Sequence, residues 1–111
     1  MMPTYKNFIP SGVIPATLLI LKEDLTIDDV ATRRHTRDCA LTSGVSAVTV
    51  NGHASEVHAC SFEEQQQILD ATMDEVGDHV PVINGVYADG SQEAARIAKM
   101  AASGGASCLL V

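Results

Sequence analysis

The sequence predicts an α/β fold in which parallel strands alternate with helices. Short apolar runs alternate along the chain with longer segments of helical character. The repeat spans roughly 30 residues, which is the size of one β-α unit. The strand-like runs are almost wholly apolar, as in strands buried on both faces of a parallel sheet. The predicted order, strand–helix–strand–helix–strand–helix–strand, fits both a doubly wound sheet and a (β/α)8 barrel.

The first predicted strand follows an irregular lead-in. Residues 1–11 form this lead-in, because Pro3 and Pro10 oppose regular structure. Residues 12–18, GVIPATL, are apolar and of strand length. The polar segment 22–26 then forms a loop.

The first helix is predicted over residues 28–43. Thr26 or Asp28 can cap its start, and the acidic pair Asp28 and Asp29 suits the positive end of the helix dipole. Gly44 is expected to end it. The apolar stripe expected to face the core consists of Val30, Ala31, Cys39 and Leu41.

A second strand and helix follow. Residues 45–50, VSAVTV, are β-branched and apolar, and an Asn-Gly turn signal comes next. Ser61 and Glu64 have the spacing of a capping box, so a helix starts there and Gly77 closes it. The apolar positions at helical spacing are Ile68, Leu69, Met73 and Val76.

Two more strands enclose the last helix. Residues 80–86, VPVINGV, predict the third strand, and residues 89–91 a turn and helix cap. The alanine-rich residues 92–102 predict a helix that the glycine pair at 104–105 stops. Residues 106–111, ASCLLV, predict a fourth strand.

Composition excludes several classes of protein. The chain has 111 residues and a formal net charge of −7, which opposes binding to nucleic acid. It contains no run of about 18 apolar residues that could span a membrane, and no signal peptide. A cytoplasmic protein that does not act at membranes is therefore expected. The three cysteines show no CxxC spacing and are expected to be reduced.

Motifs for cofactors and metals are missing. There is neither a G-x-G-x-x-G nor a P-loop motif, so no nucleotide cofactor is expected. His53, His58 and Cys60 are close in sequence, but their spacing fits no common structural zinc pattern. No metal site is predicted.

Three ordered segments resemble one enzyme family. Their sequences are GVIPATLLILKEDLTIDD (12–29), VNGHASEVHACSFEEQQQIL (50–69) and VPVINGVYADGSQEAARIAKMAASGGASCLLV (80–111). In order and spacing they resemble the strand, loop and helix motifs of the dihydrodipicolinate synthase / N-acetylneuraminate lyase family. The resemblance implies that residues 12–111 form the first four strands and three helices of a (β/α)8 barrel, a partial TIM barrel.

The resemblance also implies a chemistry. Members of this family are class I aldolases and related lyases that act on pyruvate or another 2-oxo acid. A lysine on the sixth strand forms a Schiff base with the keto carbon, and a tyrosine just past the fourth strand moves protons. A homo-oligomer is the expected assembly.

The family's carboxylate-binding segment maps onto five residues of this chain. Gly52 and Glu56 match the common pattern, whereas His53 and Ala54 replace two threonines and Ser55 replaces a glycine. All five are predicted substrate-binding residues. His53 is the candidate catalytic residue, as a proton carrier or as a partner of the carboxylate.

Other departures fit a divergent subfamily that acts on a different 2-oxo acid, and they equally fit relaxed constraint in a truncated chain. Leu19 and Ile20 replace a Thr-Pro pair after the first strand. After the third strand, Tyr87 and Asp89 stand where the common pattern has glycine and asparagine.

The chain ends before the positions that carry the Schiff-base lysine and the tyrosine, and a full barrel needs about 250 residues. Its three lysines, Lys6, Lys22 and Lys99, lie in the lead-in, a loop and a helix. The resemblance thus predicts a lyase that is catalytically incomplete as this chain. Two alternatives are a non-catalytic half-barrel module that oligomerises or binds a partner, and a self-contained flavodoxin-like domain.

Overall fold

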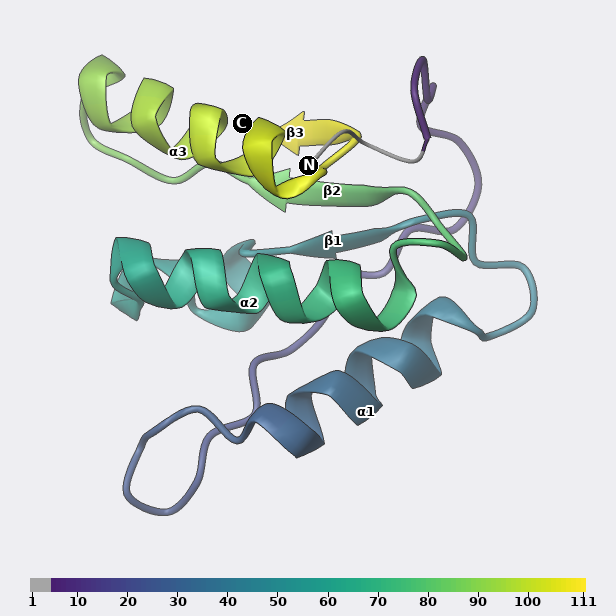
Figure 1. The fold of residues 1–111 in the computed structure, drawn as a ribbon, viewed down its shortest axis with the longest axis horizontal. Coiled ribbons are helices and arrows are strands. Elements are labelled where there is room, and N and C mark those ends of the chain that lie inside the picture. Colours follow the sequence, from purple (N-terminus) through teal and green to yellow (C-terminus); the bar gives the residue numbers. More distant parts are fainter. Residues whose placement is uncertain (1–4) are drawn as a thin grey trace.

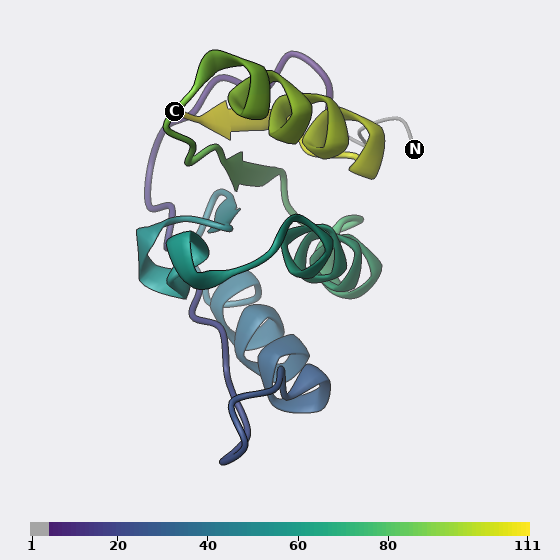
Figure 2. The same ribbon diagram turned by 90° about the vertical axis from the view of Figure 1, so that its left-hand side faces the viewer.

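The computed structural model describes residues 5–111, so the first four residues of the predicted lead-in lie outside it. The described part forms a parallel sheet with helices packed along one face (Figures 1 and 2). Helix α1 packs on α2 and α2 packs on α3, which gives a helical layer outside the strands. The α/β prediction is confirmed.

Neighbouring strands of the sheet follow one another in sequence. β1 (Val48–Val50), β2 (Val82–Gly85) and β3 (Cys108–Leu110) lie in the order β1-β2-β3, and both pairs are parallel. The segment before α1 lies beside β1, so the whole series runs 1-2-3-4. A flavodoxin-like sheet would have the order 2-1-3-4, and that alternative is therefore wrong.

The first predicted strand, residues 12–18, is not a continuous strand. Pro15 has no N–H to donate, so a regular ladder with β1 is interrupted there. Its carbonyl still accepts a hydrogen bond from the Thr49 N–H, at 2.9 Å. Two isolated parallel bridges tie the segment to its neighbour, Val13 with Val45 and Ala16 with Thr49.

Helix α1 (Asp29–Ala40) starts as predicted and ends early. The Asp28 carboxylate accepts a hydrogen bond from the Ala31 N–H at 3.0 Å, which makes Asp28 the cap rather than Thr26. The helix ends before Gly44, which lies in the following turn with φ of 93°. Glycine adopts this left-handed conformation easily, so the turn, and not the end of the helix, explains why residue 44 is a glycine.

The apolar stripe predicted for α1 is wrong at Val30 and Leu41, whereas Cys39 is partly buried and packs against the core. Val30 is 70% exposed and Leu41 is 50% exposed. The Thr32 hydroxyl donates to the Ile20 carbonyl and accepts from the Ile20 N–H, at 3.2 and 3.1 Å. A threonine is favoured on this face because the neighbouring extended segment presents backbone groups that need partners. The residues that α1 buries are Thr32, Thr36 and Ala40.

Helix α2 (Phe62–Val76) carries the predicted capping box. The Ser61 hydroxyl accepts from the Glu64 N–H at 3.1 Å, and the Glu64 carboxylate accepts from the Ser61 N–H at 2.9 Å. Gly77 follows as the C-cap, as predicted. Ile68, Leu69 and Val76 are buried, so the helical spacing identified this face correctly.

Helix α3 (Ser91–Gly104) is longer than predicted at both ends. Gly90 is its N-cap and provides no side-chain hydrogen bond, so the cap expected from residues 89–91 is absent. Gly105 ends the helix with φ of 101°, as the glycine pair indicated. The core lies between the sheet and the helices, and its most buried side chains include Val48, Val50, Val82, Leu69 and Ile97.

Candidate functional site

A pocket of about 370 Å³ lies at the carboxyl ends of the strands. The loop after β1 contributes Gly52, His53 and Ala54, and the segment after β2 contributes Tyr87. The apolar part of the lining includes Ala16, Val57, Val86 and Leu110. Open α/β sheets and barrels place their sites at this end of the strands, because the loops that follow neighbouring strands converge there.

The structure divides the five predicted substrate-binding residues. Gly52, His53 and Ala54 line the pocket, whereas Ser55 and Glu56 do not. The Ser55 side chain is 3% exposed, and its hydroxyl donates to the Gly52 carbonyl at 3.0 Å. Glu56 is exposed and has a left-handed backbone with φ of 56°, between two short 3-10 helices at His53–Ser55 and Val57–Ala59.

A buried pair of amides joins the ends of β1 and β2. Asn51 and Asn84 are both 0% exposed. The Asn51 Nδ2 group donates to Asn84 Oδ1 and to the Gln65 carbonyl on α2, each at 2.9 Å. Asn84 Nδ2 donates in turn to the Gly85 carbonyl at 3.0 Å. Sequence reasoning missed this pair, although an asparagine at the end of each of two apolar strands was a usable signal.

Three rings gather at the rim of the pocket. The His53 ring lies edge-on to Tyr87 with centroids 5.7 Å apart, and the His58 ring approaches the same tyrosine at 6.1 Å. Tyr87 is 47% exposed. The sequence singled out His53, His58 and Tyr87 separately and did not predict that they are neighbours. They meet because the fold places the loops after β1 and β2 side by side.

The ligands of a metal site do not assemble. Within residues 5–111, no three His, Cys, Asp or Glu side chains are placed to hold a metal ion, and this includes the set of His53, His58 and Cys60. Burial raises the pKa of the Cys60 thiol, with a smaller contribution from the nearby Glu64 carboxylate. No helix in the described part of the chain is long and apolar enough to cross a membrane.

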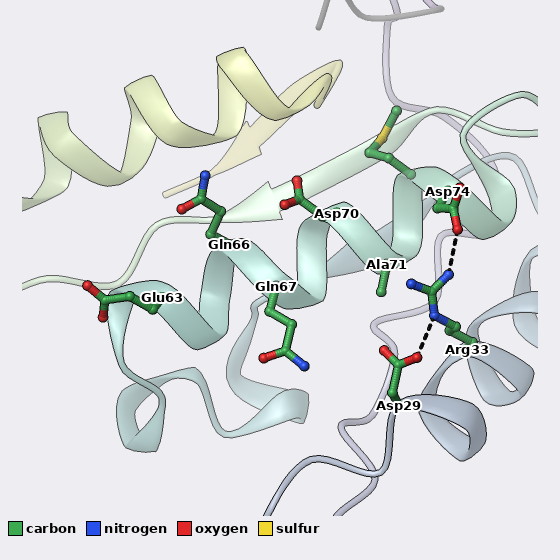
Figure 3. Close-up of a pocket in the computed structure, with 9 residues that line it drawn as sticks. Asp29, Arg33, Glu63, Gln66, Gln67, Asp70, Ala71 and Asp74 are labelled. Carbon is green, nitrogen blue, oxygen red and sulfur yellow. Dashed lines mark hydrogen bonds and ion pairs between the residues drawn. The ribbon is translucent and has the colours of Figure 1, made fainter.

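A larger hollow, about 590 Å³, lies in the helical layer between α1 and α2 and shares no lining residue with the pocket at the strand ends (Figure 3). Most of its lining residues are charged or carry amides, and Arg33 on α1 donates to Asp29 at 2.8 Å and to Asp74 on α2 at 2.7 Å. These charges satisfy one another. We therefore assign the hollow to the α1–α2 contact rather than to a ligand.

Replacement of Arg33 by alanine is expected to lower the free energy of unfolding by about 1 kcal/mol, because its ion pair with Asp74 connects the two helices near solvent and its pair with Asp29 lies within α1. Urea unfolding followed by circular dichroism measures this. The loss should shrink in high salt, which screens exposed charges. Arg34→Ala, at an exposed neighbouring position, is the matched control and should change little. Equal losses in the two variants would contradict a bridging role for Arg33.

Comparison with known sequences gives one family. The model of the dihydrodipicolinate synthetase family matches residues 9–111. A 4-hydroxy-tetrahydrodipicolinate synthase of Salinibacter ruber is 36% identical over 100 residues, which cover 90% of this chain and 33% of the relative. A DapA-like lyase of Halobacterium salinarum is 33% identical over 100 residues, with the same coverage.

Solved structures agree with the sequence matches. Dihydrodipicolinate synthase from Aquifex aeolicus superposes with a TM-score of 0.82 and 25% identity, over 90% of this chain and 33% of that one. N-acetylneuraminate lyase from Fusobacterium nucleatum gives a TM-score of 0.80 with 26% identity, over 88% and 34%. The chain spans about a third of the length of the relatives that it matches.

Proposed function

The chain belongs to the dihydrodipicolinate synthetase family, and on that premise we propose that it is the N-terminal portion of a lyase that acts on pyruvate or another 2-oxo acid through a Schiff base. The observation that carries the proposal is the pocket formed by Gly52, His53 and Ala54 at the carboxyl ends of the strands. The resemblance to the family's pattern assigns its carboxylate-binding segment to these positions.

The chemistry of the pocket supports an anionic substrate. Among residues 5–111, no Asp or Glu side chain lines it, although the chain contains 14 of them; the one carboxylate near the lining is the terminal group of Val111 in the 111-residue chain. The ionisable side chains that do line it are those of His53 and Tyr87, which can donate hydrogen bonds. Backbone N–H groups of a loop at a strand end can also hold a carboxylate.

The proposal includes catalytic incompleteness. A Schiff base needs an amine that reaches the keto carbon. Lys6, Lys22 and Lys99 are exposed, and none of them lines the pocket. We therefore expect the 111-residue chain by itself to bind a 2-oxo acid without forming an imine.

Two measurements test these statements. Incubation with pyruvate and borohydride, followed by peptide mass analysis, is expected to give no reduced adduct on any lysine. A specific adduct would contradict catalytic incompleteness. In a nitrogen-15 NMR titration, pyruvate is expected to shift the amide signals of Gly52, His53 and Ala54. Shifts confined to other regions, or none at all, would contradict the proposed site.

A second candidate function is a non-catalytic half-barrel module that oligomerises. It is favoured by the apolar side chains at the two edges of the sheet. Leu109 and Leu110 on the edge strand β3 are 39% and 54% exposed, and Val13 at the opposite edge is 62% exposed. Exposed apolar edges favour association with another chain. Sedimentation that shows a monomer at all accessible concentrations would contradict this candidate. A cytoplasmic location stays a prediction.

A further inference from the structure

Tyr87 and His53 form one continuous wall of the pocket, although they come from different loops. The rings of His53 and Tyr87 are in edge contact, with centroids 5.7 Å apart and planes at 74°. The His58 ring contacts Tyr87 at 6.1 Å and 61°, without lining the pocket itself. Aromatic edge contacts of this kind are stabilising, so the tyrosine ring is held before any ligand arrives.

The polar groups of this wall are not used elsewhere. Within residues 5–111, neither the Tyr87 hydroxyl nor the His53 imidazole makes a hydrogen bond. One other ring of each type does make a hydrogen bond. The Tyr5 hydroxyl donates to the Asp78 carbonyl at 3.0 Å, and His35 Nε2 accepts from the Leu18 N–H at 3.0 Å. Tyr87 and His53 thus present two hydrogen-bonding groups to whatever occupies the pocket.

The rest of the lining restricts where a second charged group of a ligand can lie. Ala16, Val57 and Val86 provide apolar surface, on which a carboxylate would lose its hydration without gaining a partner. The wall of His53 and Tyr87 is where such a group can be hydrogen-bonded. A volume of about 370 Å³ lies within the range of pockets for small organic ligands.

We propose that Tyr87 is a specificity-determining residue, which with His53 donates hydrogen bonds to the second carboxylate of a 2-oxo dicarboxylic acid. His58, whose ring also contacts Tyr87, is a positioning residue that supports the tyrosine ring. The inference rests on the proposed function, because it takes the substrate to be a 2-oxo acid whose first carboxylate is held by backbone N–H groups of the loop after β1, which leaves the His53 ring for the second. It adds the class of that acid and the residue that selects it.

The test compares three 2-oxo acids by NMR titration of the nitrogen-15-labelled chain. The probes are pyruvate, 2-oxopentanoate and 2-oxoglutarate, of which the last two have equal chain length and differ in the second carboxylate. We expect 2-oxoglutarate to bind about tenfold more tightly than 2-oxopentanoate, as one or two hydrogen bonds to a charged group imply. The salt concentration is held at about 0.15 M, because the net charge of −7 otherwise repels the dianion more strongly.

Two variants test whether the preference for 2-oxoglutarate depends on the Tyr87 hydroxyl. Tyr87→Phe keeps the ring contacts and removes the hydroxyl, so it should lower the preference for 2-oxoglutarate over 2-oxopentanoate by about threefold or more. Tyr5→Phe, which removes the other tyrosine hydroxyl of the chain, should leave the preference intact. An undiminished preference in Tyr87→Phe would overturn the role of Tyr87.

The outcomes separate the two proposals. If 2-oxopentanoate and 2-oxoglutarate bind equally and both shift the amides of Gly52 to Ala54, the proposed function stands and the inference fails. If none of the three acids shifts those amides, both fail.

Discussion

Replacement of Gly85 by alanine is expected to lower the free energy of unfolding by about 3 kcal/mol or more, a large fraction of the stability of a small domain. Gly85 is the last residue of β2 and lies against the end of β1, the neighbouring strand that leads into the pocket loop. A Cβ atom added at Gly85 would collide with the carbonyl oxygen of Asn51. The same Cβ would lie only 2.8 Å from the carbonyl carbon of Asn51 and 3.1 Å from the Cα of Gly52. These neighbours are backbone atoms, so no side-chain rotation can relieve the collision. Urea unfolding followed by circular dichroism measures the loss.

Gly52→Ala is the matched control for this prediction. Gly52 is also a buried glycine at a strand end, but a Cβ there would lie 3.7 Å from Thr49 Cγ2, an ordinary contact. Its φ of −99° is open to any residue. The control should lose no more than about 1 kcal/mol. Similar losses in the two variants would show that the close approach of the two strand ends is not the reason why residue 85 must be a glycine.

The contrast between these glycines shows where sequence reasoning stops. The capping box of Ser61 and Glu64 and the cap at Asp28 were predictable because their bonds join residues three apart. The requirement at Gly85 depends on the carbonyl of Asn51, which is 34 residues away in sequence (85 − 51). No local sequence pattern in β2 indicates that the Asn51 carbonyl lies so close to Gly85.

The helix α1 illustrates a second limit. Its start was predicted, but its buried face was not, because Thr32 and Thr36 look like surface residues in the sequence. Thr32 is buried because its hydroxyl pairs with both backbone groups of Ile20. Hydrophobic periodicity identifies faces that pack by apolar contact, as in α2, and misses faces that pack through hydrogen bonds.

The sequence predicted that the loop of the candidate site follows a buried strand, because the turn signal after residues 45–50 marks the end of that strand. The orientation of each side chain was not predictable. The left-handed backbone at Glu56 turns the loop, so that Ser55 bonds back to Gly52 and only the first three residues line the pocket. The contact of Tyr87 with His53 and His58 required the loops after β1 and β2 to be adjacent.

Loss of the Asn51 side chain is expected to destabilise the chain by about 3 kcal/mol. In Asn51→Ala, the Gln65 carbonyl and Asn84 Oδ1 each lose a buried donor, and an unsatisfied buried group costs about 1–3 kcal/mol. A backbone cost adds to this, because Asn51 has φ of 54° and alanine tolerates that conformation less well than asparagine. The free energy of unfolding in urea gives the total.

Two further substitutions separate the causes. Asn51→Gly removes the amide and relieves the backbone, so it should be more stable than Asn51→Ala by about 1 kcal/mol. Asn51→Asp keeps the shape but replaces the donor with an oxygen, which would face the Asn84 and Gln65 oxygens. It should therefore be at least as destabilised as the glycine variant. If Asn51→Asp were as stable as the original chain, the amide pair would not be what joins the two strand ends, and the position of the pocket loop would need another cause.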